Sequence, residues 1–201
     1  MRTFTGILAI ATLFTLTYAQ TVGMVDYERV INEAQIAQDS LRELQALGQR
    51  YQQAFQTLQE NLILTDEERQ ELTNLLLQPN LNDQQKKRVD AIKATARQRA
   101  DELQALRQKA TPTETEKAAL ERFTQMETRS REALQILEQQ WGQEINKRAE
   151  EKRSQVQKRI REVIAQVAKE KKIQVVFPAN MVLYCENDLT DEVIKRLNAK
   201  K

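Results

Sequence analysis

Apolar and small residues recur in alternating steps of four and three along an early stretch of the chain. They are Ala37, Leu41, Leu44, Gly48, Tyr51, Phe55, Leu58 and Leu62. This heptad spacing is typical of a helix that packs along a narrow seam against another helix. Gly48 leaves a gap in the seam, which Leu47 beside it is placed to fill. The spacing predicts one long helix over residues 28–63.

Helix start signals divide the next part of the chain. Thr65 precedes three acidic residues, Asn82 precedes Asp83, and Thr113 stands three residues before Glu116 as in a capping box. A helix over residues 83–110 has its own seam, which Arg99 interrupts: Val89, Ile92, Ala96, Leu103, Leu106 and Ala110. Prolines at positions 79 and 112 end the segments before the last two starts.

The longest helical segment follows residue 113. Its apolar positions are Leu120, Phe123, Leu134, Leu137, Trp141, Ile145, Ala149, Val156, Ile160, Val163 and Val167. No proline and only one glycine interrupts it up to Lys172, so we predict a helix of about 58 residues, about 87 Å long. We expect Trp141 to pack where this helix joins the rest of the protein.

The two ends of the chain are the parts that favour β-structure. Residues 22–26 form a short run of β-type residues. Near the other end, residues 173–177 predict a strand, 178–180 a turn and 181–184 a second strand. A helix is predicted over 193–198, with residues 190–192 as its N-terminal cap. The residues expected in core strands are Val22, Val25, Val175, Val176, Val182 and Tyr184. We therefore predict a mainly α protein with a small β core.

This order of segments predicts a division into a core and an arm. Residues 20–30 and 170–201 form the β-containing core, and residues 31–169 leave it and return as a long antiparallel helical hairpin. The tip is placed at Thr111–Pro112, and the breaks near Thr65 and Pro79 become either elbows or a small side hairpin. Because a lone hairpin exposes much of its seam, we expect it to gain stability by self-association.

Composition agrees with long helices and argues against catalysis. Hydrophobic residues make up 40% and charged residues 30%, with 4 glycines and 3 prolines, which is too little apolar matter for one compact globule and too few turns for an all-β fold. The absence of histidine excludes most proton-transfer and transition-metal sites. No GxxxxGK[ST] or GxGxxG loop is present, so we expect no enzyme and no cofactor.

The first nineteen residues have the pattern of a cleavable secretory signal peptide. Arg2 supplies a positive start, residues 7–16 are apolar, and Thr17 and Ala19 place small residues before the cleavage site. The apolar stretch is about half the ~20 residues that span a bilayer, which favours cleavage over anchoring. We expect export to the periplasm. In that setting the single Cys185 forms no intramolecular disulfide, and we interpret it as a buried small residue.

Charge is distributed unevenly along the chain. Residues 20–78 have 4 basic and 10 acidic residues, residues 83–110 have 8 and 4, and residues 147–172 have 10 and 4. Much of this charge is accounted for by pairing between antiparallel helices and by solvation. The basic stretch of 83–110 lies near the expected tip, where it would attract acidic client chains or anionic lipid head groups. Its candidate contact residues are Lys86, Lys87, Arg88, Lys93 and Arg97.

The end segments resemble the Skp/OmpH family of periplasmic chaperones. The resemblance rests on Val22–Asp26, on residues 173–176, on the Ala179–Tyr184 segment and on residues 188–195, which follow the family's order of strand, Ala-Asn turn, strand and capped helix. Pro178 stands where the family often has aspartate. These motifs cover about fifty residues, whereas the arm is similar only in length, period and charge.

The resemblance implies a jellyfish-like homotrimer, in which an α/β trimerisation domain joins three helical arms around a cavity. That cavity holds unfolded outer-membrane proteins without ATP. Phe123, Met126, Leu134 and Leu137 are candidates for apolar client contacts, although residues at helical spacing are more often seam residues.

Two other readings of the sequence remain. A structural or adaptor coiled coil of the cell envelope would share the signal peptide and the heptads but would not bind clients. A peripheral stalk subunit of a rotary ATPase also joins long helices to a small α/β domain, but it is cytoplasmic. Nucleic-acid binding is disfavoured because acids interrupt the basic runs and no aromatic residues are interleaved with them.

Overall fold

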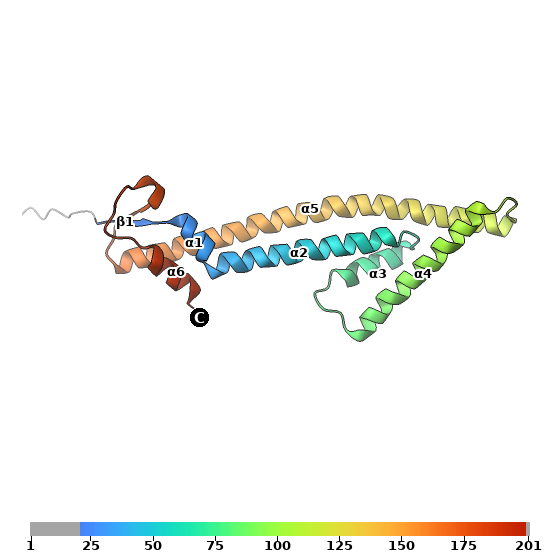
Figure 1. Ribbon diagram of the computed structural model, residues 1–201, viewed down its shortest axis with the longest axis horizontal. Helices are drawn as coiled ribbons and strands as arrows, with labels where there is room; N and C mark the ends of the chain where they lie inside the picture. The colour runs from blue at the N-terminus through green and yellow to red at the C-terminus, as the bar shows by residue number, and fades with distance from the viewer. Residues whose placement is uncertain (1–20, 200–201) are drawn as a thin grey trace, which may run out of the picture. The chain divides into compact units, whose positions relative to one another are not determined.

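The computed structural model describes residues 21–199, and these are mainly helical (Figure 1). In chain order, the elements are β1 (Val22–Val25), α1 (Tyr27–Glu33), α2 (Gln35–Glu60), α3 (Asp66–Leu76), α4 (Asp83–Gln108), α5 (Glu114–Glu170), β2 (Val175–Pro178), the 3-10 turn η1 (Ala179–Met181) and α6 (Thr190–Asn198). This confirms the mainly α fold with a small β part, and α5 is the long helix that was predicted after residue 113. The predicted signal peptide, residues 1–19, lies outside the described residues.

The chain divides into two compact units. Residues 21–34 and 159–199 form the first, which we call the terminal unit, and residues 35–158 form the second, the helical unit. Helix α5 contributes residues to both. Among the described residues, no helix is long and apolar enough to cross a membrane.

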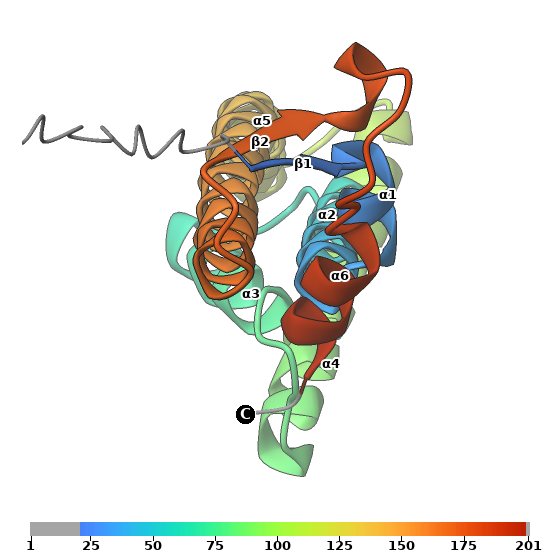
Figure 2. The same ribbon diagram turned by 90° about the vertical axis from the view of Figure 1, so that its left-hand side faces the viewer.

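The terminal unit contains a two-stranded parallel sheet of β1 and β2, which lie side by side in Figure 2. Val22 lies opposite Val175 and Val25 opposite Pro178. The other edge of β1 is also occupied, because the Met24 amide donates to the Asn187 carbonyl and its carbonyl accepts from Leu189, both at 2.9 Å. β1 is therefore flanked on both edges.

Gly23 is required by this close packing of β1. A Cβ added there would lie 3.2 Å from the Asn187 carbonyl oxygen and 3.2 Å from the Ile173 side chain. Any larger residue would push apart the segments on either side of β1.

The second strand predicted over 181–184 is wrong in this chain. The turn η1 closes with a hydrogen bond from the Val182 amide to the Ala179 carbonyl at 3.1 Å, and Val182 to Tyr184 form no strand. The backbone at Val182 is extended, with φ −130° and ψ 122°. A strand also needs a neighbour: both edges of β1 are taken, and the segment does not pair with the free outer edge of β2.

The N-terminus of helix α6 is capped by Asp188, whereas the sequence predicted a cap of residues 190–192. Thr190 is its first residue, and the Asp188 carboxylate accepts the Thr190 amide at 2.8 Å. The Thr190 hydroxyl in turn accepts the Asp26 amide of the segment after β1 at 2.9 Å. The buried apolar residues of the unit are Val25, Val30, Ala34, Ile160, Val163, Val167, Ala168, Ile173, Leu189, Val193 and Ile194.

Helices α3, α4 and α5 start where the sequence predicts, whereas the one helix predicted over 28–63 is divided into α1 and α2 at Ala34, whose backbone is extended. Thr65 and Glu68 form a capping box at α3, and Asn82 and Gln85 form another at α4. At α5, the Thr113 amide donates to Glu116 at 2.8 Å and the Glu116 amide donates back to the Thr113 hydroxyl. Each cap satisfies backbone amides that the first turn leaves without partners.

The breaks near Thr65 and Pro79 produce a small side hairpin rather than elbows. In Figure 1, α3 turns back beside the end of α2, and α4 then runs outward to the loop 109–113, from which α5 returns. A buried cluster holds this hairpin in place: Ala54, Leu58, Leu64, Leu72, Leu75, Val89, Ile92, Ala96, Leu134 and Trp141.

The predicted seams are buried only in part. In α4, Val89, Ile92, Ala96, Leu103 and Leu106 are buried, as predicted. In α2, Leu58 is the one predicted seam residue that is buried, and the buried Ala54 was not predicted; Leu41 is 57% exposed, and a Cβ at Gly48 would meet nothing within 4 Å. The gap at Gly48 is thus left open.

Trp141 does pack, but it does so within the helical unit. Its ring stacks on that of Tyr51, with centroids 4.9 Å apart and planes 7° from parallel. Trp141 also belongs to the cluster that holds the side hairpin. It therefore ties α5 to α2 well before α5 enters the terminal unit.

Candidate interaction surfaces

The terminal unit carries most of the exposed large apolar side chains of the described chain. They are Val22, Val175, Phe177, Met181, Leu183 and Tyr184. Val22, Val175 and Phe177 share one face of the sheet, because the strands are in register and side chains alternate along them. Met181, Leu183 and Tyr184, at 76%, 108% and 84% exposed, lie in and after the turn that follows. We use the name apolar face for these six residues together, three on the sheet and three in the segment after it; exposed apolar groups of this kind mark interaction sites.

The strand residues predicted for the core are divided between interior and surface. Val25 is buried, Val176 and Val182 are half-buried, and Val22, Val175 and Tyr184 are exposed. Val22, Val25, Val175 and Val176 lie in the sheet, whereas Val182 and Tyr184 do not.

The outer edge of β2 is a second feature of this surface. Within the described residues, β2 pairs with β1 alone, so its other edge has unpaired backbone groups. The extended but unpaired Val182 follows soon after in the chain. An edge strand and a free extended segment are the two halves of a β-pairing, and one chain presents both.

The five basic candidate residues all lie on α4, but not near the tip. Lys86 to Arg97 occupy its first half, at the end where the side hairpin turns. Lys86 is about 33 Å along the helix from its last residue at 1.5 Å per residue. The stretch 83–110 does run to the tip, but its candidate residues lie between the side hairpin turn, at the end of α4 that is farther from the tip, and the middle of the helix.

Two of the five candidates are neutralised by acids. Arg88 donates to both carboxylate oxygens of Glu71, at 2.7 and 2.6 Å, and this hydrogen bonding lowers the pKa of Glu71. Lys86 pairs with Asp83 at 3.3 Å. Among residues 21–199, Lys87, Lys93 and Arg97 have no ion-pair partner. Three of the five candidate cations are therefore available to bind a client or a lipid head group.

Helix α3 is tied to its neighbours by ion pairs that the sequence did not reveal. Arg99 donates to the Glu68 carboxylate at 2.5 Å, with both side chains about four-fifths covered, and also to the Ile63 carbonyl at 3.3 Å. Partial burial pushes the pKa of Glu68 upward, but hydrogen bonds from Arg99 and the Thr65 amide outweigh it and hold the pKa below its usual value. Arg99, which interrupts the seam, is therefore the anchor of α3.

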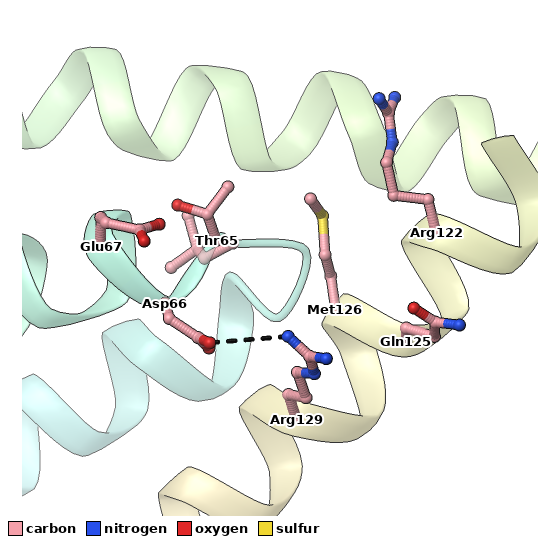
Figure 3. A pocket seen from close by; sticks show the side chains of 8 residues that line it. Thr65, Asp66, Glu67, Arg122, Gln125, Met126 and Arg129 are labelled. Carbon is pink, nitrogen blue, oxygen red and sulfur yellow. Dashed lines mark ion pairs between the residues drawn. The ribbon is translucent and has the colours of Figure 1, made fainter.

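Two hollows line the side of the helical unit where α3 meets α5. The first, of about 210 Å³, lies between the start of α3 and α5, and Figure 3 shows Arg129 of α5 reaching across it to Asp66, 3.7 Å away. The second, of about 400 Å³, is lined by Asp66, Arg69, Gln70, Thr73, Asn74, Ala133, Ile136 and Leu137. We call the second hollow the α3–α5 groove.

The apolar client candidates are seam residues for the most part. Phe123 and Leu134 are 2% and 6% exposed, so neither presents a surface. Met126 lines the first hollow and Leu137 the α3–α5 groove, and both are half-buried. Within the described residues, no group of three or more Cys, Asp and Glu side chains is placed to hold a metal ion.

Comparison with known proteins identifies the family. No curated protein and no solved structure matches the chain. A family model described as "Outer membrane protein (OmpH-like)" matches residues 77–197, which is more than half of the sequence and extends from the end of α3 through α4, α5 and β2 into α6. The chain therefore belongs to the OmpH-like family.

Proposed function

We propose that this protein is a periplasmic holdase chaperone, which binds unfolded outer-membrane proteins and prevents their aggregation without ATP. Membership of the OmpH-like family supports this reading, and the exposed apolar face of the terminal unit is the observation that carries it furthest. The protein acts as a homotrimer, in which the terminal units form the core and the helical units form arms around a client cavity.

Self-association follows from the apolar face. Leaving six large apolar side chains in water forgoes about 25 cal/mol for each Å² that burial would remove from solvent. The free edge of β2 and the extended segment around Val182 offer complementary partners on different copies of the chain. Another copy would cover both the edge and the apolar face.

Client holding suits the helical unit. A holdase has to bind many sequences weakly, which favours a surface with scattered apolar groups and charges of both signs over one deep pocket. The three unpaired cations Lys87, Lys93 and Arg97 are available to acidic client segments or to anionic lipid head groups, and their contribution would weaken as salt is added.

Export supports the cellular location. The signal-peptide pattern of residues 1–19 directs the chain to the periplasm, where ATP is absent and a chaperone must work by binding alone.

One preparation tests this proposal. The purified protein is measured by light scattering and is then mixed with a β-barrel membrane protein as that client is diluted from urea. We expect a mass three times that of one chain and loss of client turbidity at stoichiometric amounts. An elongated dimer that leaves the turbidity unchanged would instead favour a structural coiled coil.

A further inference from the structure

The α3–α5 groove has two unlike walls. Ala133, Ile136 and Leu137 of α5 form an apolar wall, while Gln70, Thr73 and Asn74 of α3 form a polar one. Ile136 is 55% exposed, and in residues 35–158 only Leu41, at 57%, is a large apolar side chain exposed to the same degree. The other large apolar residues of the helical unit are buried or half-buried, so an exposed isoleucine beside a hollow is an exception to its own pattern.

The polar wall has hydrogen-bonding capacity that the described chain does not use. The Thr73 hydroxyl is occupied, because it donates to the Arg69 carbonyl at 2.7 Å. The side-chain amides of Gln70 and Asn74 make no hydrogen bond within residues 21–199. These two residues are four apart on α3 and so lie on one face of the helix. Each amide can accept one bond and donate another, which is the pattern that a free peptide group requires.

The groove carries little net charge. Asp66 and Arg69 at its end pair at 2.5 Å, and Arg69 also donates to the Ser130 hydroxyl of α5 at 3.2 Å. A charged segment would find no opposite charge left for it. The complementary occupant is therefore an uncharged segment.

We propose that the α3–α5 groove binds a short extended segment of an unfolded client, in which apolar side chains alternate with uncharged polar ones. The segment must be extended, because a helix has already used its own backbone groups and would offer none to Gln70 and Asn74. Side chains of an extended chain point alternately to opposite sides, so one set meets Ile136 and the other meets the amides. Strands of membrane β-barrels have this alternation. The inference rests on the proposed chaperone function and specifies what one of its contacts recognises.

The length of the groove sets the size of the segment. Its lining on α3 extends from Asp66 to Asn74, which is about 12 Å of helix. An extended chain covers that distance with about four residues at 3.3 Å each. Two of these residues would place apolar side chains against α5.

Binding of two labelled peptides tests the inference. One alternates Val and Leu with Ser and Thr, and the other has the same residues with the apolar ones in a single block. Fluorescence anisotropy with the full protein is expected to show about fivefold tighter binding of the alternating peptide, the effect of covering about half an isoleucine side chain. Equal affinity for the two peptides would overturn the proposal.

Matched variants locate the contact. Ile136→Ser is expected to remove the preference between the peptides, whereas Leu41→Ser, which removes an equally exposed side chain from α2, leaves it unchanged. Gln70→Ala with Asn74→Ala is expected to weaken both peptides alike, because the amides contact the backbone; alanine also favours helix, so α3 remains folded. If Leu41→Ser acted as strongly as Ile136→Ser, or if the double variant changed neither affinity, the groove would be rejected.

A parallel turbidity assay separates this inference from the proposed function. If the unaltered protein prevents client aggregation and Ile136→Ser binds both peptides as the unaltered protein does, the groove is rejected and the chaperone function stands. A protein that never reduces turbidity rejects the chaperone function itself.

Discussion

The terminal unit and the helical unit treat their apolar residues in opposite ways. In residues 35–158, side chains such as Leu72 and Ile92 are buried within one chain, and ion pairs tie α3 to α4. In the terminal unit, Leu183 and Tyr184 lie in solvent and β2 has an unpaired edge. The helical unit covers most of its large apolar side chains within one chain, while the terminal unit leaves six of them and a strand edge open to another molecule. The contrast indicates where copies of the chain meet.

The largest expected effect comes from charging the apolar face. We expect Leu183→Asp combined with Tyr184→Asp to reduce the oligomer to single chains, because the interface would have to bury two carboxylates. Light scattering gives the mass, and circular dichroism should be unchanged since both residues are exposed. Leu41→Asp, at the exposed leucine of α2, is the control and should keep the mass of the oligomer.

Removing a buried side chain from the side hairpin should lower the stability of the fold, whereas charging the apolar face should change only the assembly. Leu72 of α3 is 0% exposed, so Leu72→Ala is expected to lower the free energy of unfolding by about 2–5 kcal/mol. The measurement is urea unfolding at one fixed protein concentration, since assembly also contributes to stability. If Leu72→Ala lowered the free energy of unfolding no more than Leu41→Ala does, the buried side chains of the side hairpin would not be what stabilises the helical unit.

The Arg99–Glu68 pair offers a smaller test within the same hairpin. Arg99→Ala leaves a partly buried carboxylate without its partner, and we expect a cost of about 1–2 kcal/mol. Arg88→Ala breaks the more exposed pair with Glu71, and a smaller cost is expected because solvent screens that pair. Thermal unfolding of the two variants should rank them in this order; the reverse order would mean that Arg99 does not anchor α3.

The smallest effect concerns the tip and depends on pH. The hydrogen bond from Lys109, aided by the Thr113 amide, lowers the pKa of Glu116 from 4.5 to about 2. A carboxyl whose pKa is lower in the folded state stabilises the protein above the unfolded value, and this stability is lost as the pH falls toward 2. Glu116→Gln should therefore melt below the unaltered protein at pH 7, and the difference should disappear between pH 4.5 and 2. A difference that persisted at pH 2 would have another origin.

Features that depend on neighbouring residues were predictable from the sequence. The caps at Thr65, Asn82 and Thr113 and the seam of α4 need only residues a few positions apart, and the structure confirms them. The family resemblance was likewise readable from the end segments, and the family match over residues 77–197 confirms it.

Features that depend on distant contacts were not predictable in the same way. The segment around Val182 has the composition of a strand, but within the described chain it pairs neither with β1, whose edges are taken by β2 and by residues 187–189, nor with the outer edge of β2. The fold-back of α3 depends on Leu72 and on Arg99, which are far from its boundaries. The expectation that Lys86 and Arg97 lie near the tip used only the order of the segments. It could not include the side hairpin, which puts Lys86 at the end of α4 away from the tip and Arg97 near the middle of the helix. Ile136 stands off the predicted seam of α5, but nothing in the periodicity marked the groove beside it.

Amide hydrogen exchange on the assembled protein tests the central claim most directly. If another copy completes the sheet, the backbone amides from Leu183 to Cys185 will be protected in the oligomer and will exchange freely in the Leu183→Asp, Tyr184→Asp variant. Amides around Leu72 and Ile92 should be protected equally in both. Rapid exchange of residues 183–185 in the intact oligomer would contradict the account, because the exposed end of the terminal unit would then not be where the chains meet.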